Sequence, residues 1–432
     1  MKQLKIWNTP INSFLKKTCL WTSAALAMIF TASCTTHTET RLTVWTNCAE
    51  FAPYAELFNN MHDTKKILPI YKKNPANELS LSRADFPDVI IASNLRTNKT
   101  ARQFRPIDTI FDRKSIAPTI FYPQLLEAGN IQHVQYLLPV SFNLPAVIFS
   151  KKNSEFIEND YMLSLDQIRT IGAAFNMQQQ NGMYSRIGFA PLASDEFLYF
   201  AVKAKGAKFR ESKTAFTWNE KALASAILFL QNWTNEANGS SLIEQDFIYK
   251  YLFTSNYKQV TSDRTLFTYI TSNQLFQLST EQTTFIDYRW IYENDKIPIE
   301  DSFVMLGIPR RSKHPNAAYD FIHWFLNADT QQAILEYNAT QNLDTNFFGI
   351  AGGFSSIKSV NEHILPLHNI QLLTNTPPTD MLAISENLPA NWDSMKEQIV
   401  LPFLKDKITS TSETLVDALD VRIDEWTKQN YN

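Results

Sequence analysis

Several aromatic and polar residues of this sequence lie where strands are predicted to end. In open α/β sheets, ligands bind beyond the carboxyl ends of the strands. A ligand with a C–H face and a rim of hydroxyls is matched by aromatic faces together with amide and carboxylate groups. This chemistry indicates noncovalent binding of a polyhydroxylated molecule. The candidate residues are Trp45, Asn47, Glu50, Asn94, Asn143, Tyr288 and Trp290, with Ser93, Arg289, Trp218 and Trp392 as further members.

Each candidate also has a purely structural interpretation. A tryptophan at the end of a strand often packs in a core, and this alternative stays open for Trp45 and Trp290. Glu50 could act near a helix N-terminus, where the helix dipole favours a carboxylate. Asn143 could be a turn residue at a hinge, and Arg289 could be a surface ion-pair partner.

Sequence motifs for catalysis and metal binding are missing. There is no P-loop, no GxSxG elbow and no GxGxxG after a predicted strand. His363 and His368 are spaced five apart, which does not place them on one helical face, so we expect no shared metal. The acidic pairs Asp195–Glu196 and Glu300–Asp301 are interpreted as solvated loop charges. We therefore expect a protein with no enzymatic activity, no cofactor and no metal.

Two apolar segments are predicted to carry the chain from one lobe to another. Leu137–Ser150 is rich in apolar and β-branched residues and is interrupted by Pro139 and Pro145. Because proline donates no ladder hydrogen bond, this pattern predicts a strand that leaves one sheet and enters another. Ser302–Pro309 is a second apolar run closed by a proline. We expect a hinge crossing at each.

Strands and helices alternate along the rest of the chain. Strands are predicted over 42–46, 87–94 and 284–288. Such alternation predicts α/β lobes with mainly parallel sheets. The helical stripes are Phe51, Tyr54, Ala55, Phe58 and Met61, then Leu223, Ala226, Ile227 and Leu230, then Ala318, Phe321, Ile322, Phe325 and Leu326.

Composition limits the possible partners and architectures. The 432 residues are more than one hydrophobic core usually serves, so we expect two domains. The net charge of −3, with no basic stripe among aromatics, argues against a nucleic-acid partner. Cys19, Cys34 and Cys48 cannot make a disulfide framework, and we expect Cys48 to be a buried thiol.

The first 34 residues have the layout of a secretory signal. Lysines precede an apolar segment that begins at Cys19, and small residues lead into Cys34. This arrangement resembles a bacterial lipobox, with Thr31 where that motif favours leucine. The resemblance implies that Cys34 is lipidated and becomes the mature N-terminus, followed by a polar tether over 35–41. The alternative is an ordinary cleaved signal.

A set of landmarks recurs in order between Leu42 and the mid-300s. They are Leu42–Trp45 with Phe58–Asn59, Pro87–Ile90, Leu138–Ser141 through Lys152, and Leu306–Pro309 through Ile322. This ordered set resembles extracellular solute-binding protein family 1, the maltose-binding-like receptors of bacterial ABC importers. The resemblance implies the type II periplasmic binding protein fold, in which crossing hinge strands join two α/β lobes. It also implies that the loop Gly352–Phe354 approaches the cleft with Phe354 as a ligand contact, an ordinary turn being the alternative.

The same resemblance implies a function. It implies an extracytoplasmic, monomeric receptor that holds a carbohydrate between closing lobes and delivers it to membrane permease subunits. A lipid on Cys34 would anchor it to the periplasmic side of the inner membrane or at the cell surface. Two alternatives stay open, namely a secreted carbohydrate-active hydrolase and a receptor-shaped protein for surface interaction or signalling.

The two crossings suggest a division of the chain. We expect 42–143 and 263–305 in the N-terminal lobe, and 144–262 and 306–432 in the C-terminal lobe. In this division Trp45 and Trp290 belong to the N-terminal lobe and Phe354 to the other. A sugar would then be clamped between their rings.

Overall fold

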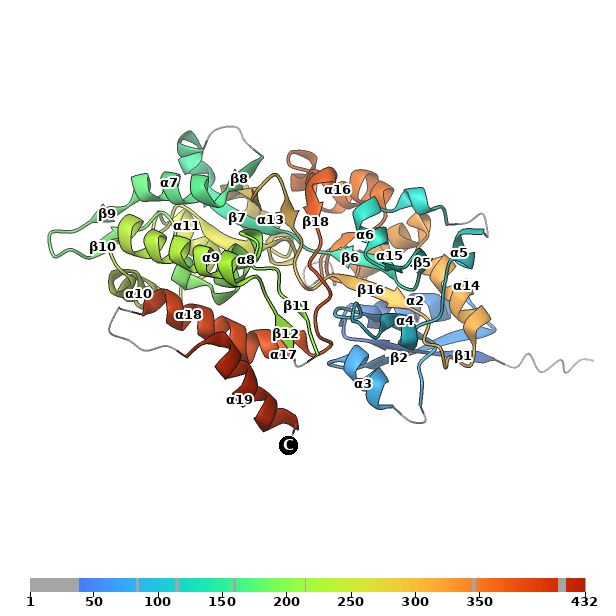
Figure 1. Cartoon of the computed structure of the whole chain (residues 1–432). Coiled ribbons are helices and arrows are strands. Elements are labelled where there is room, and N and C mark those ends of the chain that lie inside the picture. The colour runs from blue at the N-terminus through green and yellow to red at the C-terminus, as the bar shows by residue number, and fades with distance from the viewer. Residues whose placement is uncertain are drawn as a thin grey trace, which may run out of the picture.

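The computed structural model describes residues 39–82, 85–112, 116–157, 161–213, 215–343, 347–410 and 417–431. The chain forms two lobes that lie next to each other, with strands crossing between them (Figure 1). The expected signal and Cys34 lie outside the described residues. The first strand begins at Thr40, within the tether expected over 35–41.

The first lobe is built on a six-stranded sheet. β1 pairs in parallel with β2 and β3, while β16 runs antiparallel to β3 and β6. β1, β3 and β6 therefore point the same way, and their carboxyl ends meet at one edge. The strands, in sheet order, are β17 (Phe354–Ser355), β6 (Leu138–Phe142), β16 (Val304–Gly307), β3 (Val89–Ala92), β1 (Thr40–Thr46) and β2 (Lys65–Tyr71).

Aromatic packing joins the helices of the first lobe. In α2 (Phe51–Met61) and α14 (Pro315–Phe325), the predicted apolar stripes are buried, except that Met61 is 58% exposed at the last position of α2. Phe321 of α14 lies edge-on to Phe58 of α2, with ring centroids 5.6 Å apart. The other helices of this lobe are α3 (Pro75–Leu81), α4 (Thr100–Gln103), α5 (Thr109–Asp112), α6 (Pro123–Glu127), α15 (Ala328–Thr340) and α16 (Leu365–His368).

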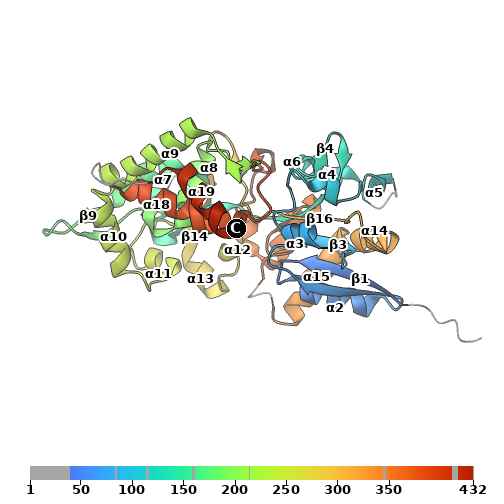
Figure 2. The same cartoon turned by 60° about the horizontal axis from the view of Figure 1, so that its bottom comes forward.

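The second lobe has a four-stranded sheet in the order β13 (Thr268–Thr271), β7 (Pro145–Ser150), β14 (Ile286–Tyr292) and β8 (Met162–Ser164). Every residue of β7 is buried, and β13 and β14 pair with it antiparallel on either side. Helices cover this sheet, as Figure 2 shows. The longer ones are α7 (Leu165–Phe175), α8 (Asp195–Ala204), α9 (Glu220–Asn232), α10 (Ser241–Lys250), α18 (Leu401–Thr409) and α19 (Leu419–Tyr431), and the shorter ones are α11 (Asn256–Thr261), α12 (Ser272–Leu275), α13 (Thr280–Phe285) and α17 (Trp392–Met395).

The run Leu137–Ser150 crosses between the lobes, as predicted. β6 belongs to the first sheet and β7 to the second, and only Asn143 and Leu144 separate them. Cys48 is a buried free thiol, as also predicted, and burial raises its pKa to about 12.

The lobes expected for 263–305 and for 306–432 are both wrong over much of their range, since β17 and α14 of the second range belong to the first lobe. β13 and β14 pair with β7 in the second lobe, and the chain returns to the first lobe only just before β16. The physical reason is that β7, buried throughout, needs ladder partners for its backbone groups on both sides. A third crossing then leads through β18 (Leu382–Ala383), which pairs with β15 (Ile297–Pro298), back to the second lobe.

Two rings that were expected to clamp a solute instead touch each other in the core. Trp290 of β14 belongs to the second lobe and Phe354 of β17 to the first. This is the reverse of the expected assignment. Both are at most 1% exposed, and their ring centroids lie 5.9 Å apart. Phe142 and Phe276 extend this contact. These rings therefore pack against one another where the two sheets meet.

Truncation of Trp290 tests this assignment. Trp290→Ala should lower the free energy of unfolding by about 3–5 kcal/mol, because it empties a fully buried site. The measurement is urea unfolding. Trp218→Ala, at a half-buried position, serves as the control and should cost clearly less. Equal costs for the two variants would contradict the core assignment.

Candidate functional site

The carboxyl ends of β1, β3 and β6 bring three polar residues to one edge of the first sheet. Asn47 and Ser93 bond to each other twice, with Asn47 Nδ2 donating to Ser93 Oγ (2.9 Å) and the Ser93 N–H donating to Asn47 Oδ1 (3.2 Å). Asn143 follows β6. The predicted grouping of polar side chains beyond strand ends is therefore present at this edge.

Asn94 connects this edge with the second lobe. Its backbone adopts a φ of 59°, a left-handed conformation that asparagine tolerates better than most residues. Asn94 Nδ2 donates to Asp393 Oδ2 of α17 at 2.8 Å. Next to it, Arg96 Nη1 donates to the carbonyl of Ser385 at 3.0 Å. The lobes are thus in direct contact here, and the pocket beside this contact has a volume of about 30 Å³.

Asn143 joins three parts of the hinge. Its Nδ2 donates to the carbonyl of Gly352 (2.8 Å), and its Oδ1 accepts from Ser272 Oγ (2.6 Å). Its own carbonyl accepts the N–H of Glu300 at 2.9 Å. Asn143 is only 5% exposed, and its hydrogen bonds hold these segments of the hinge together.

Glu50 presents a carboxylate beside the same loop. Gly352 has a φ of +73°, and a Cβ at this position would lie 2.9 Å from Glu50 Oε1. The backbone conformation therefore favours glycine, and any Cβ here would also displace the end of the Glu50 side chain. Burial raises the pKa of Glu50. Since Asn143 and Glu50 both approach Gly352, these two predicted residues are brought together.

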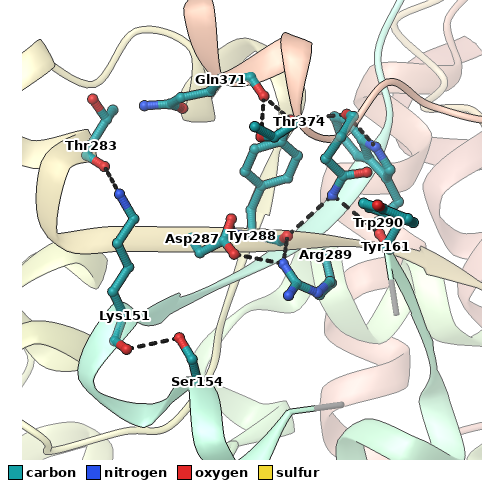
Figure 3. A network of polar contacts seen from close by, with 11 residues as sticks. Lys151, Ser154, Tyr161, Thr283, Asp287, Tyr288, Arg289, Trp290, Gln371 and Thr374 are labelled. Carbon is teal, nitrogen blue, oxygen red and sulfur yellow. Dashed lines mark hydrogen bonds and ion pairs between the residues drawn. The ribbon is translucent and has the colours of Figure 1, made fainter. Parts of the chain in front are cut away.

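Four of the predicted aromatic residues, Trp45, Tyr288, Trp290 and Phe354, are packed away from solvent. Trp45 is 6% exposed, and Lys72 Nζ lies 5.2 Å from its ring centroid. Figure 3 shows Tyr288 and Trp290 pointing toward one backbone segment, where both donate to the carbonyl of Asn375, at 3.0 and 3.3 Å. Together with buried Phe354, these rings offer no open face in this conformation. The structural interpretation thus describes these rings. Arg289 does form an ion pair, with Asp287 at 2.8 Å, but its side chain is only 11% exposed, so the expected surface position is wrong.

The interpretation of Glu300–Asp301 as solvated charges is wrong. The Asp301 side chain is 4% exposed and pairs with Lys203 Nζ at 3.0 Å. Burial alone would raise its pKa, but Lys203 and Lys396 lower it to about 2. The other donors to its carboxylate are Trp392 Nε1 (2.8 Å), Ser385 Oγ (3.1 Å) and the Tyr199 hydroxyl.

Glu300 is placed differently from its neighbour. One of its carboxylate oxygens accepts the Tyr269 hydroxyl at 2.8 Å, and burial raises the pKa of Glu300 although Lys203 opposes this. The sequence did contain a signal for both residues, because they directly precede the second predicted crossing at Ser302. Because both lobes pack against a crossing segment, a charged side chain on that segment is enclosed from two sides.

The pair Asp195–Glu196 is closer to its prediction. Glu196 is exposed and pairs with Lys396 at 2.9 Å, whereas half-buried Asp195 pairs with Lys405 at 3.2 Å. Lys396 lies between Glu196 and Asp301. Burial lowers its pKa, but Asp301, Glu196 and Glu300 together raise the pKa above its usual value. The second lobe therefore supplies both signs of charge near Asp393.

Comparison with solved structures decides the fold. The sugar-binding protein MalE from Xanthomonas citri matches with a TM-score of 0.66 at 13% identity, over 90% of this chain and 96% of that one. An ABC substrate-binding protein from Listeria monocytogenes, solved with cycloalternan, matches with a TM-score of 0.61 at 12% identity, over 90% and 99%. The chain has the two-lobe solute-binding-protein fold. The fold class implied by the family resemblance is confirmed.

A third structure extends the comparison. The lacto-N-biose-binding protein of an ABC transporter from Bifidobacterium longum has the same solute-binding-protein fold, with a TM-score of 0.59 at 11% identity over 91% of this chain and 98% of that one. No protein-family model matches the chain, and no curated protein matches it.

The described part of the chain contains neither a metal-binding cluster nor a membrane-spanning helix. There, no three His, Cys, Asp or Glu side chains come together in a way that could hold a metal ion. In the same residues, no helix combines the length and apolar character needed to cross a bilayer. His363, which the sequence spaces five residues from His368, lies 3.9 Å from the carboxylate of Glu362.

The charge of Asp301 should control stability at acidic pH. Because its pKa is lowered from 3.8 to about 2, its contribution is complete above pH 3.8 and is lost as the pH falls toward 2. Asp301→Asn should cost about 3–5 kcal/mol at neutral pH, since Lys203 is left buried without its partner. Urea unfolding between pH 7 and 2 measures both effects.

Two matched variants complete that experiment. Adding Lys203→Met to Asp301→Asn should recover part of the loss, because the stranded cation is removed. Asp406→Asn breaks a more exposed ion pair with Arg422 and should cost at most about 1 kcal/mol. A cost for Asp301→Asn as small as that of Asp406→Asn would refute the role given to the buried carboxylate.

Proposed function

We propose that this protein is an extracytoplasmic receptor that captures a carbohydrate between its two lobes and hands it to the permease of an ABC importer. The observation that carries the proposal is the polar junction between the lobes, set in a solute-binding-protein fold. Structural neighbours were solved with cycloalternan and with lacto-N-biose, which supports a saccharide as the solute.

The polar groups at the junction suit a sugar. Asn47, Glu50 and Asn94 belong to the first lobe, and Asp393 of the second lobe contacts Asn94. A sugar hydroxyl both donates and accepts, so it can replace the Asn94–Asp393 hydrogen bond with one bond to each partner. With the lobes in contact, the pocket of about 30 Å³ is too small for a saccharide. Binding therefore requires the lobes to open first.

The hinge gives this motion a defined path. Three crossings connect the lobes, and Asn143 links the first crossing with the second through the Glu300 N–H. Rotation about a few residues at such crossings moves the lobes as rigid bodies. A solute that contacts both lobes favours the closed state by its differential affinity.

A saccharide screen tests the proposal. Mono- and oligosaccharides should include one that raises the melting temperature, because a ligand that binds only the folded state stabilises it. Polyols, amino acids and polyamines form the comparison arms. Stabilisation by one of these and by no saccharide would contradict the proposed solute class, and breakdown of the bound sugar would point to a hydrolase.

Substitution at the junction then locates the binding site. Asp393→Ala should weaken binding of the identified sugar by about 1.5–3 kcal/mol, the value of a hydrogen bond to a charged group. Titration calorimetry measures this loss. Asp246→Ala, an exposed acid of α10 away from the junction, is the control and should bind normally. Unchanged affinity in Asp393→Ala would place the sugar elsewhere.

The lipid anchor is a separate part of the proposal. The small residues before Cys34 support modification of its thiol, which would tether the receptor near the permease. Cys34→Ala should move the protein from the membrane fraction to the soluble fraction and abolish palmitate incorporation. Cys48→Ala is the control, because that thiol is buried. Continued sedimentation of Cys34→Ala with membranes, still carrying palmitate, would disprove the anchor.

A further inference from the structure

A separate pocket lies behind the third crossing. It has a volume of about 350 Å³ and lies between the end of α8, the turn after β14 and the segment 383–386. Ser385 and Glu386 line this pocket and also the small pocket at the junction of the lobes. The crossing segment is therefore a partition with the junction on one side and this pocket on the other.

The walls of the pocket are mainly apolar. Ala204, Phe209, Pro298 and Ile384 supply much of this surface. A cavity of roughly 150 Å³ already accepts a benzene ring, so this pocket has room for a ring with a substituent. The polar part of the lining consists largely of charged side chains, among them three lysines.

The charges in and around the pocket leave two lysines unbalanced. Lys203 is paired with Asp301, and the lining acid Glu293 is paired with Lys205 at 2.9 Å. The remaining acid, Glu386, interacts with Arg96 on the other side of the crossing segment and raises its pKa, against the larger lowering effect of burial. Within the described residues, neither Lys208 nor Lys296 has a carboxylate within ion-pair distance.

Both lysines are exposed residues in tight turns at the edge of the pocket. Lys208 has a φ of +48°, close after Gly206 at +94°. Lys296 follows a turn in which Asn294 and Asp295 also have positive φ, and its N–H and carbonyl bond to Glu293. The pocket thus combines an apolar interior with two lysines that extend from tight turns at its edge.

We propose that this pocket binds a small organic monoanion, with its apolar body against Phe209 and Ile384 and its carboxylate toward Lys208 and Lys296. Apolar burial supplies the affinity, and the unpaired ammonium groups select for negative charge. The site is independent of the saccharide proposed for the junction. It also has a different chemistry, because its lining acids Glu293 and Glu386 already interact with the cations Lys205 and Arg96.

Benzoate is the test probe, with benzamide and benzylamine as matched neutral and cationic probes. Binding to the full-length protein is followed by ligand-observed NMR. Benzoate should bind at least about tenfold tighter than benzamide, as expected when one charged hydrogen bond is lost, and its affinity should fall as salt is added. Benzylamine should not bind. Equal binding of the three probes, or no benzoate binding at millimolar concentrations, overturns the proposal.

Variants locate the probe. Lys208→Gln combined with Lys296→Gln should weaken benzoate binding by about tenfold or more and leave benzamide unchanged. Lys221→Gln combined with Lys428→Gln removes the same charge from exposed positions outside the pocket and should have no effect. Ala204→Leu fills the interior and should weaken both probes. Unchanged benzoate binding in the pocket double variant, with correct folding shown by urea unfolding, refutes the site.

Discussion

The enclosed carboxylate of Asp301 is the constraint around which the junction of the lobes is organised. A charge removed from water costs several kcal/mol unless it is paired and fully hydrogen-bonded. Asp301 meets this demand with donors from three separate parts of the chain, Lys203, Ser385 and Trp392, besides the Tyr199 hydroxyl. Satisfying one buried charge therefore fixes the second crossing against α8, α17 and the third crossing at once.

Much of the architecture could be predicted from the sequence, because it depends on local patterns. The proline-interrupted run Leu137–Ser150 predicted a strand shared between two sheets, and the stripe from Ala318 to Phe325 predicted the buried face of α14. Strand pairing could not be predicted in the same way. Which sheet takes β13 and β14 depends on the unpaired backbone of β7, more than a hundred residues earlier, and no local pattern records it.

The same distinction between local pattern and distant contacts applies to the residues of the candidate site. Asn47, Glu50 and Asn94 followed from the position of strand ends, which is a local property, and the structure places them at the sheet edge or the junction. The positions of the aromatic residues could not be predicted in this way, because a tryptophan fits a core as well as a binding surface. Only the tertiary contacts of Trp290 show that it belongs to the core. Asp301 was missed because adjacent acids are usually solvated, and its enclosure arises from elements far apart in the chain.

The three crossings have a consequence for how the chain acquires its structure. The first sheet is complete only when β17 is present, near residue 354, and the second lobe is complete only with the helices after residue 391. Neither lobe is a continuous stretch of chain. A protein synthesised from its N-terminus usually folds its first domain while the next is being made. Here that order is not available, and both lobes must wait for nearly the entire polypeptide before either can close its hydrophobic core.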